Sequence, residues 1–258
     1  MYILIAIVSL LASFLTFFSG FGLGTILLPV FALFFDLPTS ILLTAMVHFL
    51  NNIFKFFLVS KKINKEIFLS FGITSLLAAF VGAWCLKQIS VPIIVMQYNL
   101  FNHTFSISLI GIILGLLILF FALWEVIPYF AKLSFSENKI MFGGFLSGFF
   151  GGLSGHQGAL RTAFLVKLKL EKEVFVATGI AIACLVDAAR MTIYATDFKS
   201  ELISQNYKLI LVAVLSAWVG ALAGNKLIKK TTYTFIKWFV TVFMVVIALL
   251  IILGVLNK

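Results

Sequence analysis

Long, nearly unbroken runs of apolar residues dominate the chain, and short polar or basic stretches separate them. A membrane-spanning helix needs about 20 consecutive apolar residues, and at that length the sequence divides into eight hydrophobic blocks. The blocks lie near 2–35, 39–60, 66–86, 105–130, 141–166, 173–195, 207–225 and 235–256. Because apolar residues follow one another instead of alternating with polar ones, the pattern predicts helices and argues against a β-barrel. We therefore expect an all-α polytopic membrane protein.

The amino-acid composition also indicates a membrane protein. Hydrophobic residues make up 62% of the 258 residues and charged residues only 11%, whereas a soluble domain carries about 25% charged residues. So few polar groups cannot cover the surface of a soluble globule, which excludes a soluble enzyme, a nucleic-acid-binding protein and a disordered chain. The net charge of +10 is explained by lysines in short loops that orient the chain in the bilayer. The expected partners are lipid and a small solute, and not nucleic acid.

The first and the fifth block each contain a glycine-rich break, at Ser19–Gly24 and at Gly148–Gly158. Each break is followed, in the next block, by a threonine and then by a cation at similar distances. These residues are Thr44 and Lys55 in one half, and Thr178 and Arg190 in the other. The layout predicts two pseudo-symmetric repeats of four segments, 1–130 and 141–258, joined by a linker over 131–140.

The charges of the loops distinguish two topologies for these repeats. If all eight blocks cross the membrane once, the fifteen cations other than Lys55, Arg161, Arg190 and Lys237 divide eight to seven between the two sides. If blocks one and five instead enter as re-entrant hairpins bent at their glycines, eleven cations share one side. Only Lys87, Lys199, Lys208 and Lys258 then lie on the other. The second division follows the positive-inside rule and makes the repeats inverted, although a broken helix that still spans the membrane fits the glycines equally well.

The two glycine breaks are candidate anion sites. A helix interrupted within the membrane exposes free N–H groups, and the positive end of its dipole, to a cavity where an anion can bind. Glycine permits the unusual backbone and the close approach of a ligand, although glycines also serve tight helix packing. The backbone groups predicted to bind substrate are those of Gly22, Gly24, Thr25, Gly155 and Gly158.

Polar side chains inside the apolar blocks extend this candidate site. A charge deep in the membrane is costly and usually serves a pathway or a partner. Arg161 lies just beyond the second break, and arginine suits two-pronged contact with an oxyanion; the alternative for this side chain is snorkelling to the interface. The hydrogen-bonding side chains predicted to bind substrate are His48, Asn51, Asn52, His156 and Gln157.

Two further charged residues, Asp187 and Arg190, lie three residues apart on one helical face, so they can pair with each other. We expect them either to form a structural ion pair or to act in coupling or gating by rearranging between transport states. His156 is a candidate carrier of a coupled proton because histidine titrates near neutral pH, and the alternative is a structural hydrogen bond.

One motif suggests an enzyme. Gly152–Gly155 matches the GxSG pattern of rhomboid-type intramembrane serine proteases, with Ser154 as the nucleophile. Such a serine needs a histidine base within hydrogen-bond reach, but no histidine follows His156, and we do not expect His156 itself to aim at Ser154. The sequence also has no HExxH motif, no Walker loop and no intramembrane pair of aspartates. We therefore predict that the protein is not an enzyme and uses no metal or cofactor.

The chain resembles the TauE/SafE family of sulfite and organosulfur anion transporters. The run Gly20–Pro29 (GFGLGTILLP) is similar to the G-x-G-G-G…P run of that family, and the cluster Gly151–Gly158 and the ATG at Ala177–Gly179 add to the resemblance. Leu23 replaces a family glycine, and His156–Thr162 departs from the plain glycine run, which indicates a distinct subgroup. The resemblance implies movement of small sulfur-containing oxyanions across a bacterial inner membrane.

Together these observations predict a secondary transporter for a small anion, either sulfite, thiosulfate or a small organosulfonate, with proton coupling as a hypothesis. The alternatives are a passive anion channel with the same site chemistry and an intramembrane serine protease that uses Ser154. The direction of transport, the coupling ion and the oligomeric state, a homo-oligomer included, stay open.

Overall fold

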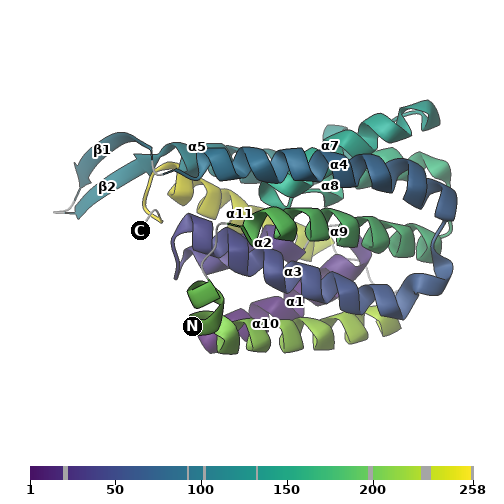
Figure 1. Ribbon diagram of the computed structural model, residues 1–258, viewed down its shortest axis with the longest axis horizontal. Helices are drawn as coiled ribbons and strands as arrows, with labels where there is room; N and C mark the ends of the chain where they lie inside the picture. The colour runs from purple at the N-terminus through teal and green to yellow at the C-terminus, as the bar shows by residue number, and fades with distance from the viewer. Residues whose placement is uncertain are drawn as a thin grey trace.

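Helices make up most of the chain in its computed structural model (Figure 1). The structure describes residues 1–19, 23–91, 93–100, 103–131, 133–196, 200–227 and 234–256. The helices of the first half are α1 (Tyr2–Ser19), α2 (Leu23–Ala32), α3 (Leu37–Val59), α4 (Lys65–Ile89), α5 (Leu109–Val126) and the short α6 (Pro128–Ala131). Those of the second half are α7 (Ile140–Ser154), α8 (Gly158–Leu165), α9 (Lys172–Tyr194), α10 (Ser200–Leu227) and α11 (Thr234–Ile252). Short 3-10 turns lie at Ser60–Lys62, Glu137–Lys139 and Val166–Leu168.

Within the described residues, four helices are long and apolar enough to cross a membrane, and four shorter apolar helices accompany them. The long ones are Leu37–Lys62, Lys65–Ile89, Lys172–Tyr194 and Leu202–Lys226. Their outer faces carry large apolar side chains that the protein leaves exposed, as the stripe of Leu69, Ile73, Leu77, Val81 and Trp84 along α4 illustrates. So much exposed apolar surface requires lipid around it. The prediction of a helical, multi-pass membrane protein is confirmed.

The segment between α4 and α5 forms a β-hairpin, which the sequence analysis did not predict. Strands β1 (Ile94–Leu100) and β2 (His103–Ser108) pair antiparallel, with Tyr98 opposite Phe105. Alternating polar and apolar residues favour a strand over a helix here, so α5 begins at Leu109 and not near 105. The Tyr98 hydroxyl donates to the carbonyl of Leu253 at 2.8 Å. The hairpin, the start of α1 and the end of α11 lie at the same end of the bundle (Figure 1).

Helix α8 runs back along α7. Gly155 ends α7 in the left-handed region, at φ 81°, which a residue with a side chain rarely adopts. The Ser147 hydroxyl then donates to the carbonyl of Gln157 at 3.0 Å. The amide of Phe135, ahead of α7, donates to the carbonyl of Ala163 at 3.2 Å near the end of α8. The two helices therefore form an antiparallel pair.

Helix α2 likewise runs opposite to α1. The Ser13 hydroxyl of α1 donates to Asn51 Oδ1 of α3 at 3.0 Å, and Lys55, one turn later in α3, donates to the Ser13 carbonyl and to the hydroxyl of Thr16. Helices α1 and α3 therefore run in the same direction. Helix α2 runs against α3, because a short turn joins the two and Gly24 lies against Thr44 and His48.

Glycines allow two helix pairs to approach closely. Gly148 of α7 lies against the backbone of Ser75 in α4, where a Cβ would collide with the main chain, and Gly220 of α10 lies in the same way against the backbone of Leu10 in α1. Small residues at such positions are the usual means by which membrane helices pack.

Two other neighbouring pairs run antiparallel. His48 in the middle of α3 contacts Asp187 in α9, whereas Lys62, just after α3, forms an ion pair with Glu173 at the start of α9. Helix α5 also runs antiparallel to α11.

Candidate functional site

A cavity of about 30 Å³ lies between α1, α2, α3, α8 and α9. A volume of roughly 10–15 Å³ admits one water molecule, so this space has room for about two waters. Its polar lining comes from Thr16, His48, Asn52, Lys55, Gln157 and Arg161. Four of these six residues, His48, Asn52, Gln157 and Arg161, are among the side chains predicted from the sequence to bind substrate.

Helix α3 supplies three of these side chains from one face. His48, Asn52 and Lys55 follow one another at intervals of about one turn, so they project in the same direction, and all three are buried. Lys55 Nζ donates to the carbonyl of Ser13 at 3.3 Å and to the hydroxyl of Thr16 at 3.4 Å. It also lies 5.4 Å from the centre of the Phe17 ring, a distance at which a cation is attracted to an aromatic face.

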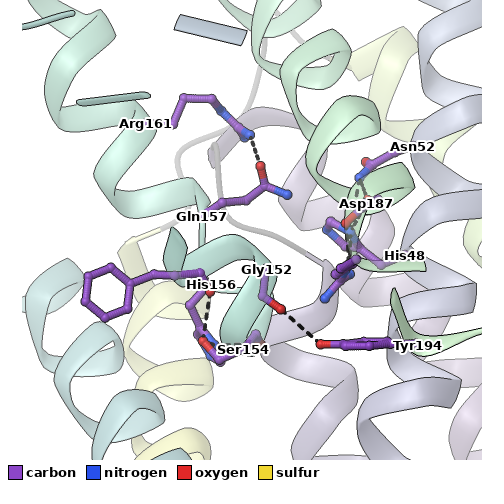
Figure 2. Close-up of polar contacts among 11 residues, drawn as sticks. His48, Asn52, Gly152, Ser154, His156, Gln157, Arg161, Asp187 and Tyr194 are labelled. Atoms are coloured by element: carbon purple, nitrogen blue, oxygen red, sulfur yellow. Dashed lines mark hydrogen bonds and ion pairs between the residues drawn. The ribbon is translucent and has the colours of Figure 1, made fainter. Parts of the chain in front are cut away.

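The end of the α7–α8 connection and the first turn of α8 supply two more of these side chains. Gln157 directly precedes α8, and Arg161 follows one turn later, where its Nη1 donates to Gln157 Oε1 at 3.2 Å (Figure 2). Among the residues the structure describes, no acceptor contacts Gln157 Nε2, although this atom is buried. Gly179 of α9 makes room for the guanidinium, since a Cβ there would lie 3.2 Å from Arg161 Nε.

Beside the cavity, Asp187 of α9 is the centre of a fully buried cluster (Figure 2). Its Oδ2 accepts from His48 Nδ1 at 2.6 Å and from Asn52 Nδ2 at 2.7 Å; the ring proton belongs on Nδ1 because the carboxylate can only accept. Arg190 Nη2 lies 2.9 Å from Oδ1, close enough for an ion pair although not aligned as a hydrogen bond. Asp187 and Arg190 therefore do pair, and His48 and Asn52 connect the pair to the cavity.

The family model described as "Sulfite exporter TauE/SafE" matches residues 5–251, nearly the whole chain. The chain belongs to the TauE/SafE family. Members of this family are transporters, so the chain is a multi-pass membrane transporter. No curated protein and no solved structure matches it at a significant level.

The charges around the cavity fit the anionic substrate that TauE/SafE membership suggests. Among the described residues, the buried charged side chains are the bases Lys55, Arg161 and Arg190 and the single acid Asp187. Buried charges are stable only when they are compensated.

Most of the other residues predicted from the sequence to bind substrate lie near the cavity without lining it. Asn51 Oδ1 accepts from Ser13, and Gly24, with Thr25 beside it, lies against α3 next to His48. Gly155 lies beside the Arg190 guanidinium, and Gly158 begins α8. Gly22 is outside the described residues.

The sequence analysis did not include Lys55 and Thr16 among the binding residues. Lys55 follows Asn52 by about one helical turn, and this spacing was the signal that could have identified the lysine. Thr16 carried no comparable signal, because its place depends on the packing of α1 against α3.

His156 contacts Ser154, which was not expected from the sequence. Its Nδ1 is 3.1 Å from Ser154 Oγ and 3.0 Å from the Ser154 carbonyl, and its ring stacks on Phe121 at 5.5 Å. The expectation that His156 would not aim at Ser154 is wrong, because the left-handed turn at Gly155 brings the imidazole back onto the end of α7. Ser154 Oγ, however, donates to the carbonyl of Phe150 at 3.1 Å, the usual bond of a serine within a helix.

The described part of the chain does not support a histidine base for Ser154 or a metal site. No carboxylate there is within ion-pair distance of His156, so nothing orients this imidazole as a base. No group of three or more His, Cys, Asp or Glu side chains could hold a metal ion there.

Proposed function

We propose that this protein carries a small sulfur-containing oxyanion across a bacterial inner membrane and binds it in the cavity between α1, α2, α3, α8 and α9. The observation that carries the proposal is the lining of that cavity. Lys55 and Arg161 bring basic groups to it, and Gln157 Nε2 is a buried donor that contacts no acceptor among the described residues. Amide, imidazole and guanidinium donors are the groups that recognise an oxyanion.

In this proposal the anion lies beside the starts of the half-helices α2 and α8. Arg161 and Lys55 neutralise its charge, while Gln157, Asn52 and His48 donate hydrogen bonds. The backbone N–H groups near Gly24, Thr25 and Gly158 add the positive ends of two helix dipoles.

We further propose that residues 1–130 and 141–258 are inverted repeats. Helices α1–α2 would match α7–α8, and α3, α4 and α5 would match α9, α10 and α11. The contact of α1 with α10 then corresponds to that of α7 with α4, and both are built on glycines. The matched pairs α3 with α9 and α5 with α11 run antiparallel, as a two-fold axis in the membrane plane requires.

The same helix directions support the proposal of a re-entrant topology. With α1–α2 and α7–α8 as hairpins that do not cross, three helices of each repeat span the bilayer. The loops after α3, α5, α8 and α10 then share one side, which collects the eleven basic residues counted from the sequence. The positive-inside rule makes that side cytoplasmic.

Proton coupling is proposed for the cluster of His48, Asp187 and Arg190. A carboxylate that is shared between an imidazole and a guanidinium can release one partner when the other changes its protonation. In this proposal Asp187 alternates between them as the site opens to either side, which would make the ion pair part of the transport cycle.

The direct test is flux into proteoliposomes that contain the purified protein. Sulfite, thiosulfate, methanesulfonate and chloride would be offered in parallel, with and without a pH gradient. A carrier should show saturable uptake of one sulfur anion, and unlabelled anion on the opposite side of the membrane should accelerate this uptake. Flux that does not saturate and is not accelerated in this way would favour a channel. Absence of flux for all four anions would contradict the proposed function. An uptake rate that does not change with a pH gradient would contradict proton coupling.

A further inference from the structure

A second and larger pocket lies directly beside the cavity. Its volume is about 510 Å³, and it lies where α3 ends, α9 begins and α10 ends. This end of α3 is at the end of the bundle opposite the β-hairpin (Figure 1). Val176 lines both the pocket and the cavity, so the two spaces meet at this side chain. We call the second space the outer pocket.

The same two helices lead from the cavity to the outer pocket. On α3, Lys55 lines the cavity, and Leu58, about one turn later, lines the outer pocket. On α9, which runs antiparallel to α3, Ile180 lines the cavity, and Val176 lies one turn earlier. Successive turns of two neighbouring helices thus line the cavity first and the outer pocket next, so the outer pocket extends the cavity toward the end of the bundle.

The junction between the two spaces is apolar and tightly packed. Val176 and Ile180 are buried and belong to one hydrophobic cluster with Phe17, and Leu58 packs against it. Such side chains offer no hydrogen bond to an anion, which makes its passage between them costly. A sulfur oxyanion is also larger than the two waters for which the cavity has room. Passage of an anion therefore requires the ends of α3 and α9 to move apart.

An ion pair joins these two helix ends. Lys62, in the turn after α3, pairs with Glu173, in the first turn of α9, and both residues line the outer pocket. Their side chains are 54% and 37% exposed, whereas Val176 is only 7% exposed, so the pair lies on the solvent side of the junction. Lys61 also lines the outer pocket. Lysines here attract an anion, which then competes with Glu173 for Lys62.

We infer that the outer pocket is the route of the anion between the cavity and solution, and that the Lys62–Glu173 ion pair is the gate of this route. The inference rests on the proposed function and adds the route to it. In the closed state the ion pair holds the ends of α3 and α9 together outside Val176. An anion that replaces Glu173 beside Lys62 releases the two ends, and the junction widens. In the proposed topology this gate faces the cytoplasm.

A cysteine placed behind the junction tests the gate. Ile180→Cys would be made in a protein whose own cysteines are replaced (Cys85→Ala and Cys184→Ala), because both are free thiols. The probe is 2-sulfonatoethyl methanethiosulfonate, a water-soluble anion that modifies thiols, and mass spectrometry of the protein in detergent gives the rate of modification. Glu173→Gln and Lys62→Gln each break the ion pair. We expect either change to raise the rate about two- to fivefold, the range for one exposed ion pair.

Two controls separate the gate from a general loosening of the protein. Glu66→Gln removes an exposed acid at the start of α4 that does not line the outer pocket, and it should leave the rate unchanged. The exchange of Lys62→Glu with Glu173→Lys restores opposite charges and should return the rate to its original value. If Ile180→Cys does not fold, Ala183→Cys takes its place, because Ala183 lines the cavity one turn further in.

Flux tests the route itself. Modification of Val176→Cys should stop uptake of whichever sulfur anion the proteoliposomes carry, because the added group fills the junction. Modification of Lys65→Cys should have no effect, since Lys65 is exposed beside the same end of the bundle without lining the outer pocket.

Uptake that persists after complete modification of Val176→Cys would overturn the route. A modification rate at Ile180→Cys that neither Glu173→Gln nor Lys62→Gln raises, or that Glu66→Gln raises equally, would overturn the gate. Both results would leave the proposed function standing. Absence of flux for every anion in the unmodified protein would instead contradict the proposed function, and the modification rates would still decide whether the ion pair controls access to the cavity.

Discussion

The Asp187 cluster and the cavity beside it share helices α3 and α9, yet they differ in whether an acid lies beside the bases. In the cluster, the carboxylate contacts His48, Asn52 and Arg190 at 2.6–2.9 Å. In the cavity, basic side chains gather without an acid, and Gln157 Nε2 contacts no acceptor among the described residues. The acid of the cluster has its counter-charge within the protein, and we propose that an anion supplies negative charge to the cavity. Loss of a charge should therefore reduce stability in the first region and binding in the second.

The largest expected effect is the loss of stability in Asp187→Asn. This change leaves Arg190 buried without a counter-charge, and breaking a buried pair in this way costs about 3–5 kcal/mol. Thermal unfolding of the detergent-solubilised protein would measure the loss. The double variant Asp187→Asn with Arg190→Gln should recover much of it, and an unchanged unfolding temperature in the single variant would show that the pair does not stabilise the fold.

Arg161→Gln should reduce anion binding more than it reduces stability. No acid lines the cavity, so this change leaves no lining carboxylate without a partner, and the loss of stability should be smaller than the roughly 3–5 kcal/mol typical of a broken buried pair. Anion affinity and flux should fall at least tenfold, because a charge-assisted contact with the substrate is lost. Arg161→Lys, which keeps the charge without the planar fork, should retain part of the flux. Unchanged flux and affinity in Arg161→Gln would remove this residue from the site.

Gln157→Met should have a smaller effect on binding. Methionine has a similar length and removes the donor that contacts no acceptor among the described residues, and one such hydrogen bond contributes about 0.5–1.5 kcal/mol, or roughly twofold to tenfold in affinity. Calorimetry with thiosulfate would detect this change. A loss as large as that of Arg161→Gln would mean that Gln157 acts mainly by positioning the guanidinium.

The smallest effect is expected for Ser154→Ala. Ser154 bonds to its own helix and does not line the cavity, so flux should stay within about twofold of the unmodified protein. If this variant loses all function but unfolds at the normal temperature, the contact between Ser154 and His156 has a functional role.

Much of the architecture could be predicted from the order of residues alone. The length of the apolar blocks and the scarcity of charge determine that the helices lie in lipid, because backbone groups there must be paired within helices. The resemblance of the glycine runs to TauE/SafE motifs was sufficient to predict the family, which the match over residues 5–251 confirms. The hairpin of β1 and β2 was missed because its polar residues were interpreted as a loop between membrane segments.

The candidate site was predictable only in part. The polar residues of α3 and the residues Gln157 and Arg161 were recognisable because polar groups within apolar segments are costly and therefore informative. Neither the contact of His48 with Asp187, 139 residues apart, nor the approach of α1 to Lys55 follows from local spacing.

The sequence by itself thus determined which segments are buried in lipid and where their helices break, since these properties depend on hydrophobicity and glycine over short stretches of chain. The tertiary structure decided which buried charges meet. Asp187 compensates Arg190 and not Lys55, because the packing of α3 against α9 brings Asn52 and Asp187 together and leaves Lys55 facing the cavity.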